Sequence, residues 1–189
     1  MRILILHVLV ILFKYLLKIS YIFKMSEDAT ELGYLIDFKE QMVKFLDELI
    51  IQFPEEAAFY FIRIFVKDKI PVQDVLGRFM RDCLPYRKFI QEKNDLFFLN
   101  SDIIYNTYAT EVGQDEMNKF KDMWVGGKLD DEDKECIWAW MKLFFKLSTC
   151  YYKKFGCVDG WEFDLEAEVE KTNKAFESEL KATDNKISK

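Results

Sequence analysis

The feature that most constrains the fold is a long segment, residues 129–156, whose two ends both carry clear helix signals. Asp130 suits the N-cap position, and the three acids that follow it lie where the helix macrodipole favours negative charge. At the other end, two lysines precede Gly156, and glycine adopts the left-handed conformation that commonly follows a helix. These signals predict one helix over the whole segment.

The predicted helix has only a narrow polar stripe. Its polar residues recur at steps of seven, four, three and four, so they share one face: Glu135, Lys142, Lys146, Thr149 and Lys153. Almost all the remaining residues are apolar, and we expect Cys136 and Cys150 to be small buried hydrophobes. Such a helix must be covered by other helices on most sides. The acids at its start are contiguous, which excludes an EF-hand metal site and favours a helix N-terminus.

The composition favours further helices over strands. Glycine and proline are scarce, at 7 and 3 residues, while half of the chain is hydrophobic and 18 residues are phenylalanine. A β-sandwich needs many turns, so helices with short connections are the better prediction. At 189 residues, one domain with a sizeable core is the default. We predict an all-α, compact multi-helix domain over residues 30–162, built around the helix at 129–156.

Each of the three prolines is predicted to open a helix, because proline fits the first helical turn. The expected helices cover residues 37–53, 54–68, 71–83 and 85–93, with shorter ones at 102–108 and 113–124. Residues 54–68 are apolar on nearly all sides, so we expect this helix to be buried. Arg63 within it is expected to reach the surface or to pair with an acid, and the alternative is an anchor for a partner protein. Gly77 is expected to allow a close helix crossing.

Residues 1–24 form a hydrophobic leader with three competing interpretations. Residues 3–23 have the length of a membrane anchor, although two lysines interrupt them. A cleaved signal peptide would match the apolar stretch but lacks a small-residue cleavage site. In the third interpretation translation starts at Met25, where the composition changes abruptly to that of a soluble N-terminus.

The charge of the chain bears on its partners. The net charge is −6, and residues 1–25 hold four basic residues and no acid, so the remainder carries −6 − 4 = −10. An acidic body disfavours nucleic acid as a partner and suits a protein partner. Arg78, Arg81, Arg87 and Lys88 lie close in sequence, and we interpret them as ordinary surface charges. The alternative is a local basic patch that binds nucleic acid.

The sequence offers no pattern for catalysis or for a cofactor. Its four cysteines include no C-x-x-C pair, and the single histidine, His7, lies in the leader, so no zinc set can be built. No histidine in the body of the chain can serve a serine or cysteine nucleophile, and the phosphate- and dinucleotide-binding glycine motifs are missing. We predict that the protein is not an enzyme and has no catalytic residue, cofactor or metal.

After Gly156 the character of the chain changes. Val158 and Trp161 are expected to pack back on the core. Residues 163–189 form an acidic tail, in which 164–180 predict a solvated helix, and we expect disorder from Ala182. The alternative for this tail is a peptide that binds a partner.

Three stretches carry a resemblance: FKEQMVKFLDELIIQFPEE, RIFVKDKIPVQDVLGRF and LDDEDKECIWAWMKLFFKLSTCYY. They resemble a family of small uncharacterised proteins of large DNA viruses of algae and amoebae (phycodnavirus- and mimivirus-like), over residues 37–155. That family pairs a helix ending in Phe-Pro with a late helix carrying Ile-Trp-x-Trp. The resemblance implies a helical architecture and a viral setting, and it assigns no catalytic or binding residue.

These observations predict a non-enzymatic viral protein-interaction or assembly factor with a protein partner, located in the host cytoplasm or the virion. One alternative is a membrane-anchored viral protein, held by residues 3–23 in a host or viral membrane. The other is a nucleic-acid-associated factor that uses the local basic patch.

Overall fold

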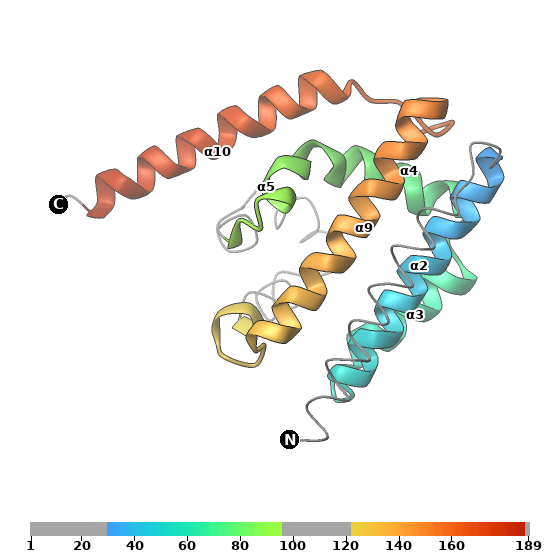
Figure 1. Ribbon diagram of the computed structural model, residues 1–189, viewed down its shortest axis with the longest axis horizontal. Coiled ribbons are helices and arrows are strands. Elements are labelled where there is room, and N and C mark those ends of the chain that lie inside the picture. The colour runs from blue at the N-terminus through green and yellow to red at the C-terminus, as the bar shows by residue number, and fades with distance from the viewer. Residues whose placement is uncertain (1–29, 96–121, 188–189) are drawn as a thin grey trace. The chain divides into compact units, whose positions relative to one another are not determined.

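The computed structural model describes residues 30–95 and 122–187, and all regular structure in these ranges is helical (Figure 1). The elements are α2 (Glu31–Gln52), α3 (Ala57–Asp68), α4 (Val72–Cys83), the 3-10 helix η1 (Leu84–Tyr86), α5 (Arg87–Gln91), α9 (Asp131–Phe155) and α10 (Leu165–Ile187). The predicted all-α class is therefore confirmed. Contacts divide the chain after Tyr34, and the packing described below lies within Leu35–Lys189.

Several sequence predictions lie outside the described residues. They are the leader at 1–24 with its three interpretations, the short helix at 102–108, and the helix at 113–124 up to residue 121. Within the described part of the chain, no helix combines the length and the hydropathy needed to cross a lipid bilayer.

The ends of α9 are set by its predicted caps. The Asp130 carboxylate accepts a hydrogen bond from the Asp133 backbone N–H at 2.8 Å, and the Asp133 carboxylate accepts one from the Asp130 N–H at 3.2 Å. This reciprocal capping box satisfies two backbone donors at the helix start. At the other end, Gly156 has φ of 85° and its N–H donates to the Tyr152 carbonyl at 2.9 Å. The prediction of one helix between these residues is confirmed.

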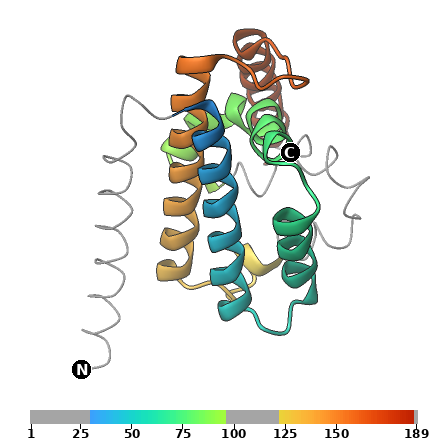
Figure 2. The same cartoon turned by 90° about the vertical axis from the view of Figure 1, so that its right-hand side faces the viewer.

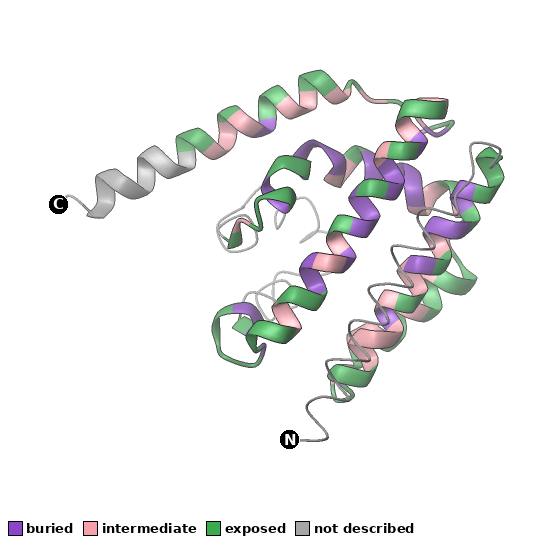
Figure 3. Ribbon diagram, in the orientation of Figure 1, coloured by how far each residue is buried: buried purple, intermediate pink, exposed green. Residues whose placement is uncertain are grey.

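The core is an aromatic cluster around Phe144 on α9, which is fully buried. Its ring centroid lies 5.5 Å from Phe38 and 5.6 Å from Phe45, both on α2, and 5.9 Å from Phe79 on α4. Trp140 stacks on Phe144 at 5.7 Å. Figure 2 shows α2 and α9 side by side, and Figure 3 shows buried residues recurring along α9. The expectation that α9 is covered by its neighbours is confirmed.

A polar contact fixes the register between α2 and α9. The indole N–H of Trp140 donates to the Glu48 carboxylate at 2.6 Å. A half-buried carboxylate is a strong acceptor, so this bond satisfies the tryptophan donor and positions α2 along α9.

The loop after α9 folds back on α4, as predicted. Val158 is buried, and the Trp161 indole lies on Gly77, where an added Cβ would overlap the indole ring. The Trp161 indole N–H donates to Asp74 at 2.9 Å, and the Arg81 guanidinium lies 4.7 Å from the ring centroid. The expected close helix crossing at Gly77 is therefore corrected: glycine makes room for a tryptophan side chain from a loop.

The prolines only partly fulfil their predicted role. Pro71 is the N-cap of α4, whereas Pro85 lies inside η1 and α5 begins only at Arg87. Pro54 lies in a turn closed by the Glu56 N–H, which donates to the Phe53 carbonyl at 3.1 Å. Glu56 has ψ of 89°, outside the helical region, so α3 begins at Ala57 rather than at Pro54.

The start of α2 also differs from the sequence prediction. The helix begins at Glu31 rather than at residue 37. The Thr30 hydroxyl accepts a hydrogen bond from the Gly33 N–H at 3.2 Å, which is an N-cap contact that the sequence analysis overlooked.

The predicted burial of Cys136 and Cys150 is wrong, since both side chains are exposed. Cys150 lies one turn after Lys146 and beside the polar stripe, and Cys136 lies in the first turns of α9. The buried small residue of this helix is instead Ser148, whose hydroxyl donates to the Phe145 carbonyl at 3.2 Å.

The acidic tail forms α10, which packs on η1 and α5. Asp164 accepts hydrogen bonds from the Glu166 and Ala167 N–H groups at 3.1 and 3.0 Å and caps the helix. The Phe176 ring lies 4.4 Å from that of Phe89 on α5, which gives the helix an inner face. It continues to Ile187, where the sequence predicted disorder from Ala182, and ion pairs one turn apart such as Glu170–Lys174 support the helix.

Replacing Gly77 by alanine tests the contact with Trp161. The new methyl group overlaps the indole, so we expect a loss of about 1–3 kcal/mol in unfolding free energy. In a Trp161→Gly background all the overlapping side-chain atoms are gone, and the same change should gain up to about 1 kcal/mol from helix propensity. Urea denaturation of the four proteins in this double-mutant cycle measures the coupling. Stabilisation by Gly77→Ala in the wild-type chain would contradict the packing.

Candidate interaction surface

The outer side of α3 is made of large apolar side chains. Phe61, Ile64 and Phe65 are spaced three and four residues apart and share one face, and their exposed fractions are 71%, 51% and 59%. Tyr60 and Ile62 flank them at 42% and 39%. We call these five residues the α3 face. A single exposed apolar residue is ordinary, but five on one short helix form a patch of the kind found at interaction sites.

The predicted burial of residues 54–68 is wrong. α3 lies wholly within the described part of the chain, and none of its residues is buried. Its inner side faces α2, where Arg63 pairs with Asp47 and the Phe59 ring lies 6.1 Å from that of Phe53, the residue that follows α2. An apolar sequence is covered only where a neighbouring element reaches it, and the described elements reach one side of α3.

Arg63 fixes the orientation of α3. Its guanidinium forms an ion pair with Asp47 on α2, and the second contact, from Nη2 to Oδ2, is 3.4 Å. The hydrogen bond to Asp47 raises the pKa of Arg63 above its usual value. The predicted pairing with an acid is confirmed, while the alternative role as a partner anchor stays a prediction. The Lys39 ammonium donates to the Ile70 carbonyl at 2.6 Å and secures the α3–α4 corner.

Charged residues lie at both ends of the α3 face with opposite predominant signs. Two acids, Glu55 and Glu56, precede the helix. Lys67, Asp68 and Lys69 lie at its end, and all three are exposed. Glu56 is half-buried and also lies 3.9 Å from the ammonium of the exposed Lys128, a long contact that stabilises little.

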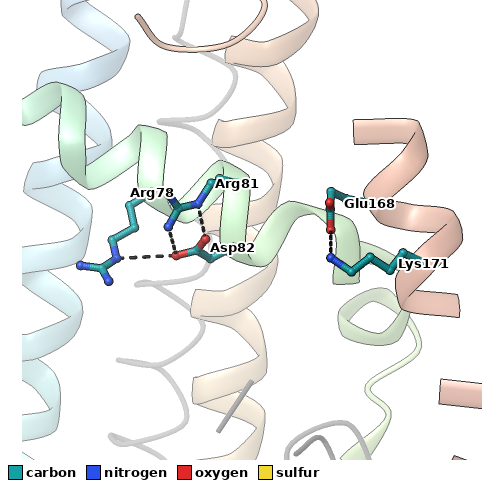
Figure 4. Close-up of polar contacts among 5 residues, drawn as sticks. All are labelled: Arg78, Arg81, Asp82, Glu168 and Lys171. Atoms are coloured by element: carbon teal, nitrogen blue, oxygen red, sulfur yellow. Dashed lines mark hydrogen bonds and ion pairs between the residues drawn. The ribbon is translucent and has the colours of Figure 1, made fainter. Parts of the chain in front are cut away.

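The four residues of the possible basic patch are not one uninterrupted cluster. Figure 4 shows Arg78 and Arg81 both directed at Asp82, from which Arg81 is 2.6 Å and Arg78 is 3.6 Å away. The Asp82 side chain is only 8% exposed, and its carboxylate faces both guanidinium groups. It therefore offsets part of the positive charge of the two arginines. Arg87 and Lys88 lie exposed on α5. Their role as ordinary surface charges and the nucleic-acid alternative both stay predictions.

The remaining pKa shifts have separate structural causes. Burial raises the pKa of Asp133 in the capping box and that of Tyr152 at the end of α9. The hydrogen bond from Lys174 lowers the pKa of Glu170 on α10. Among the described residues, no group of three or more His, Cys, Asp or Glu side chains is arranged to hold a metal ion.

No protein-family model, curated protein or solved structure matches this chain. The resemblance to the viral family stays a prediction.

Thiol labelling tests the exposure of the cysteines, all four of which are thiols. We expect a maleimide to modify Cys136 and Cys150 before the half-buried Cys83 and Cys157, because solvent access limits the reaction. Peptide mass spectrometry of the native chain at short reaction times measures the order, and the denatured chain is the control for complete labelling. Equal rates at all four positions in the native chain would contradict the structure.

Proposed function

We propose that the protein is a non-enzymatic interaction or assembly factor that binds another polypeptide through the α3 face. One observation carries this proposal: α3 exposes five large apolar side chains while its opposite side is tied to α2. The packing of an apolar helix face against a second helix is a recurrent mode of protein recognition.

The energetics of this surface favour a bound state. The five side chains present on the order of 500 Å² of apolar surface, if a fully exposed aromatic side chain contributes about 200 Å². At about 25 cal/mol per Å², covering this surface contributes on the order of 10 kcal/mol before the entropic cost of association. This gain is comparable to the cost of association, about 4–15 kcal/mol, so net affinity requires a partner of complementary shape that also buries apolar surface of its own.

Protein is the partner class that this surface favours. Its centre is apolar and aromatic, as in the cores of protein–protein interfaces, and charged residues of both signs lie at its two ends. The net charge of −6 works against phosphate-rich partners. The viral resemblance supports a role in a virus particle or in a viral complex of the host cytoplasm. The membrane-anchored alternative depends on residues 3–23, outside the described part of the chain.

Replacing Phe61 and Phe65 by glutamate tests the role of the α3 face. Both side chains are exposed, so the fold should be retained, with a change in unfolding free energy within about 1 kcal/mol. We expect the double variant to lose co-purification with viral particles or with a viral protein complex, measured by quantitative mass spectrometry in the cells that produce the chain.

A matched control is the double variant Lys142→Gln, Lys146→Gln on the exposed polar stripe of α9, which changes the net charge by the same −2. It should co-purify like the wild-type chain. Equal co-purification of the α3 variant, or absence of the wild-type chain from particles and complexes alike, would contradict the proposal.

A further inference from the structure

We propose that α10 is a releasable cover, and that the surface beneath it binds an amphipathic helix of another protein when α10 separates. This surface consists of buried residues of η1 and α5, and we call it the η1–α5 surface: Leu84, Pro85, Tyr86 and Phe89. It shares no residue with the α3 face, so the inference goes beyond the proposed function.

The attachment of α10 is that of an amphipathic helix. Its inner face is marked, at steps of four, three and four residues, by Leu165, Val169, Thr172 and Phe176. Thr172 is buried and the other three residues are half-buried. α10 contacts η1, and the Phe176 ring lies 4.4 Å from that of Phe89. The helix is therefore held by a narrow, mostly apolar face.

Polar side chains do not tie α10 to the rest of the domain. Among its described side chains, at 165–178, no ion pair or hydrogen bond reaches another element: both ion pairs and the Ser178 hydroxyl contacts stay within α10 (Figure 4 shows Glu168 and Lys171). By contrast, α2, α3 and the end of α5 are each fixed by a polar contact, which are Glu48–Trp140, Asp47–Arg63 and Lys93–Glu135. α10 can therefore open at a lower cost than unfolding of the domain.

Opening of α10 uncovers aromatic surface. With α10 in place, Phe89 is 5% exposed and Phe176 covers its ring. An apolar surface that becomes exposed in this way favours a new partner. Because α10 shows which shape fits, we expect the partner to present a helix with apolar residues three and four positions apart and an aromatic residue in the place of Phe176.

α10 remains beside this surface when it opens. Phe163 lies one residue before the cap of α10, and its ring is 5.8 Å from that of Tyr152 on α9. The Phe163 carbonyl also accepts a hydrogen bond from the Cys157 thiol at 3.5 Å. A short tether gives α10 a high effective concentration, so α10 closes again unless a partner competes for the surface. In a second copy α10 is tethered to its own domain in the same way, which disfavours exchange between copies.

Binding of a synthetic α10 peptide to the full chain tests whether the surface accepts a helix from outside. The probe is a fluorescent peptide of residues 164–187, titrated with up to about 300 µM chain and followed by anisotropy. In the wild-type chain α10 competes with the peptide, and Phe176→Ala in the chain weakens this competition. We expect the peptide to bind the Phe176→Ala chain at least about tenfold more tightly than the wild-type chain. A peptide that itself carries Phe176→Ala should bind neither chain.

A matched control is Ser178→Ala, a neutral exchange on the exposed side of α10, which should leave peptide binding at the wild-type level. Limited trypsin cleavage, followed by mass spectrometry at early times, checks the fold of each variant. Cleavage after the exposed Lys171 should be faster in the Phe176→Ala chain, because this bond is cut only when α10 opens. Cleavage after Lys142, which is exposed on α9, should remain slow in every chain.

Equal affinity of the peptide for the wild-type and Phe176→Ala chains overturns the inference, as does binding of the peptide that carries Phe176→Ala. Sedimentation equilibrium covers the remaining occupant. A wild-type dimer that Phe176→Ala abolishes would assign the surface to α10 of a second copy and overturn the choice of a different protein. The α3 face is unchanged in all of these variants, so failure of this inference leaves the proposed function untouched.

Discussion

The contact between α9 and α2 around Phe144 holds α2 in place and, through α2, sets the orientation of α3. Phe38 and Phe45 bring α2 against α9, and the Trp140–Glu48 hydrogen bond sets the register of the two helices. α2 in turn holds α3 from one side only, through the Phe53–Phe59 contact and the Asp47–Arg63 ion pair. The outward direction of the α3 face is therefore a consequence of the aromatic core rather than an independent property of α3.

Sequence reasoning succeeded where the signals are local. The caps of α9 depend on residues within one turn, and the polar stripe follows from helical periodicity, so both could be read from the chain. The same periodicity failed for Cys150, whose apolar character suggested burial although its angular position lies next to the polar stripe. It failed more seriously for α3. Periodicity shows that a helix is apolar on most sides, but an interior helix and an interface helix share that pattern.

The Trp161 site shows a second limit of sequence reasoning. Its three contacts with α4, at Asp74, Gly77 and Arg81, join residues 80 or more positions apart, and no local pattern links them. The glycine was noticed, but the residue that fills its space was not predictable. This site also engages one of the basic residues of the possible nucleic-acid patch. Arg81 is held between the Trp161 ring and Asp82, so a charge that looked available in the sequence is engaged by the fold.

An exposed aromatic face poses a solubility problem that the charge of the chain counters. At a net charge of −6, copies repel one another at long range, which opposes random contact between apolar patches. Under the proposed function, contact at the α3 face is favourable only where a partner of complementary shape covers the apolar side chains. The charge of the chain therefore disfavours random contacts at this face and leaves the contact that covers the apolar surface.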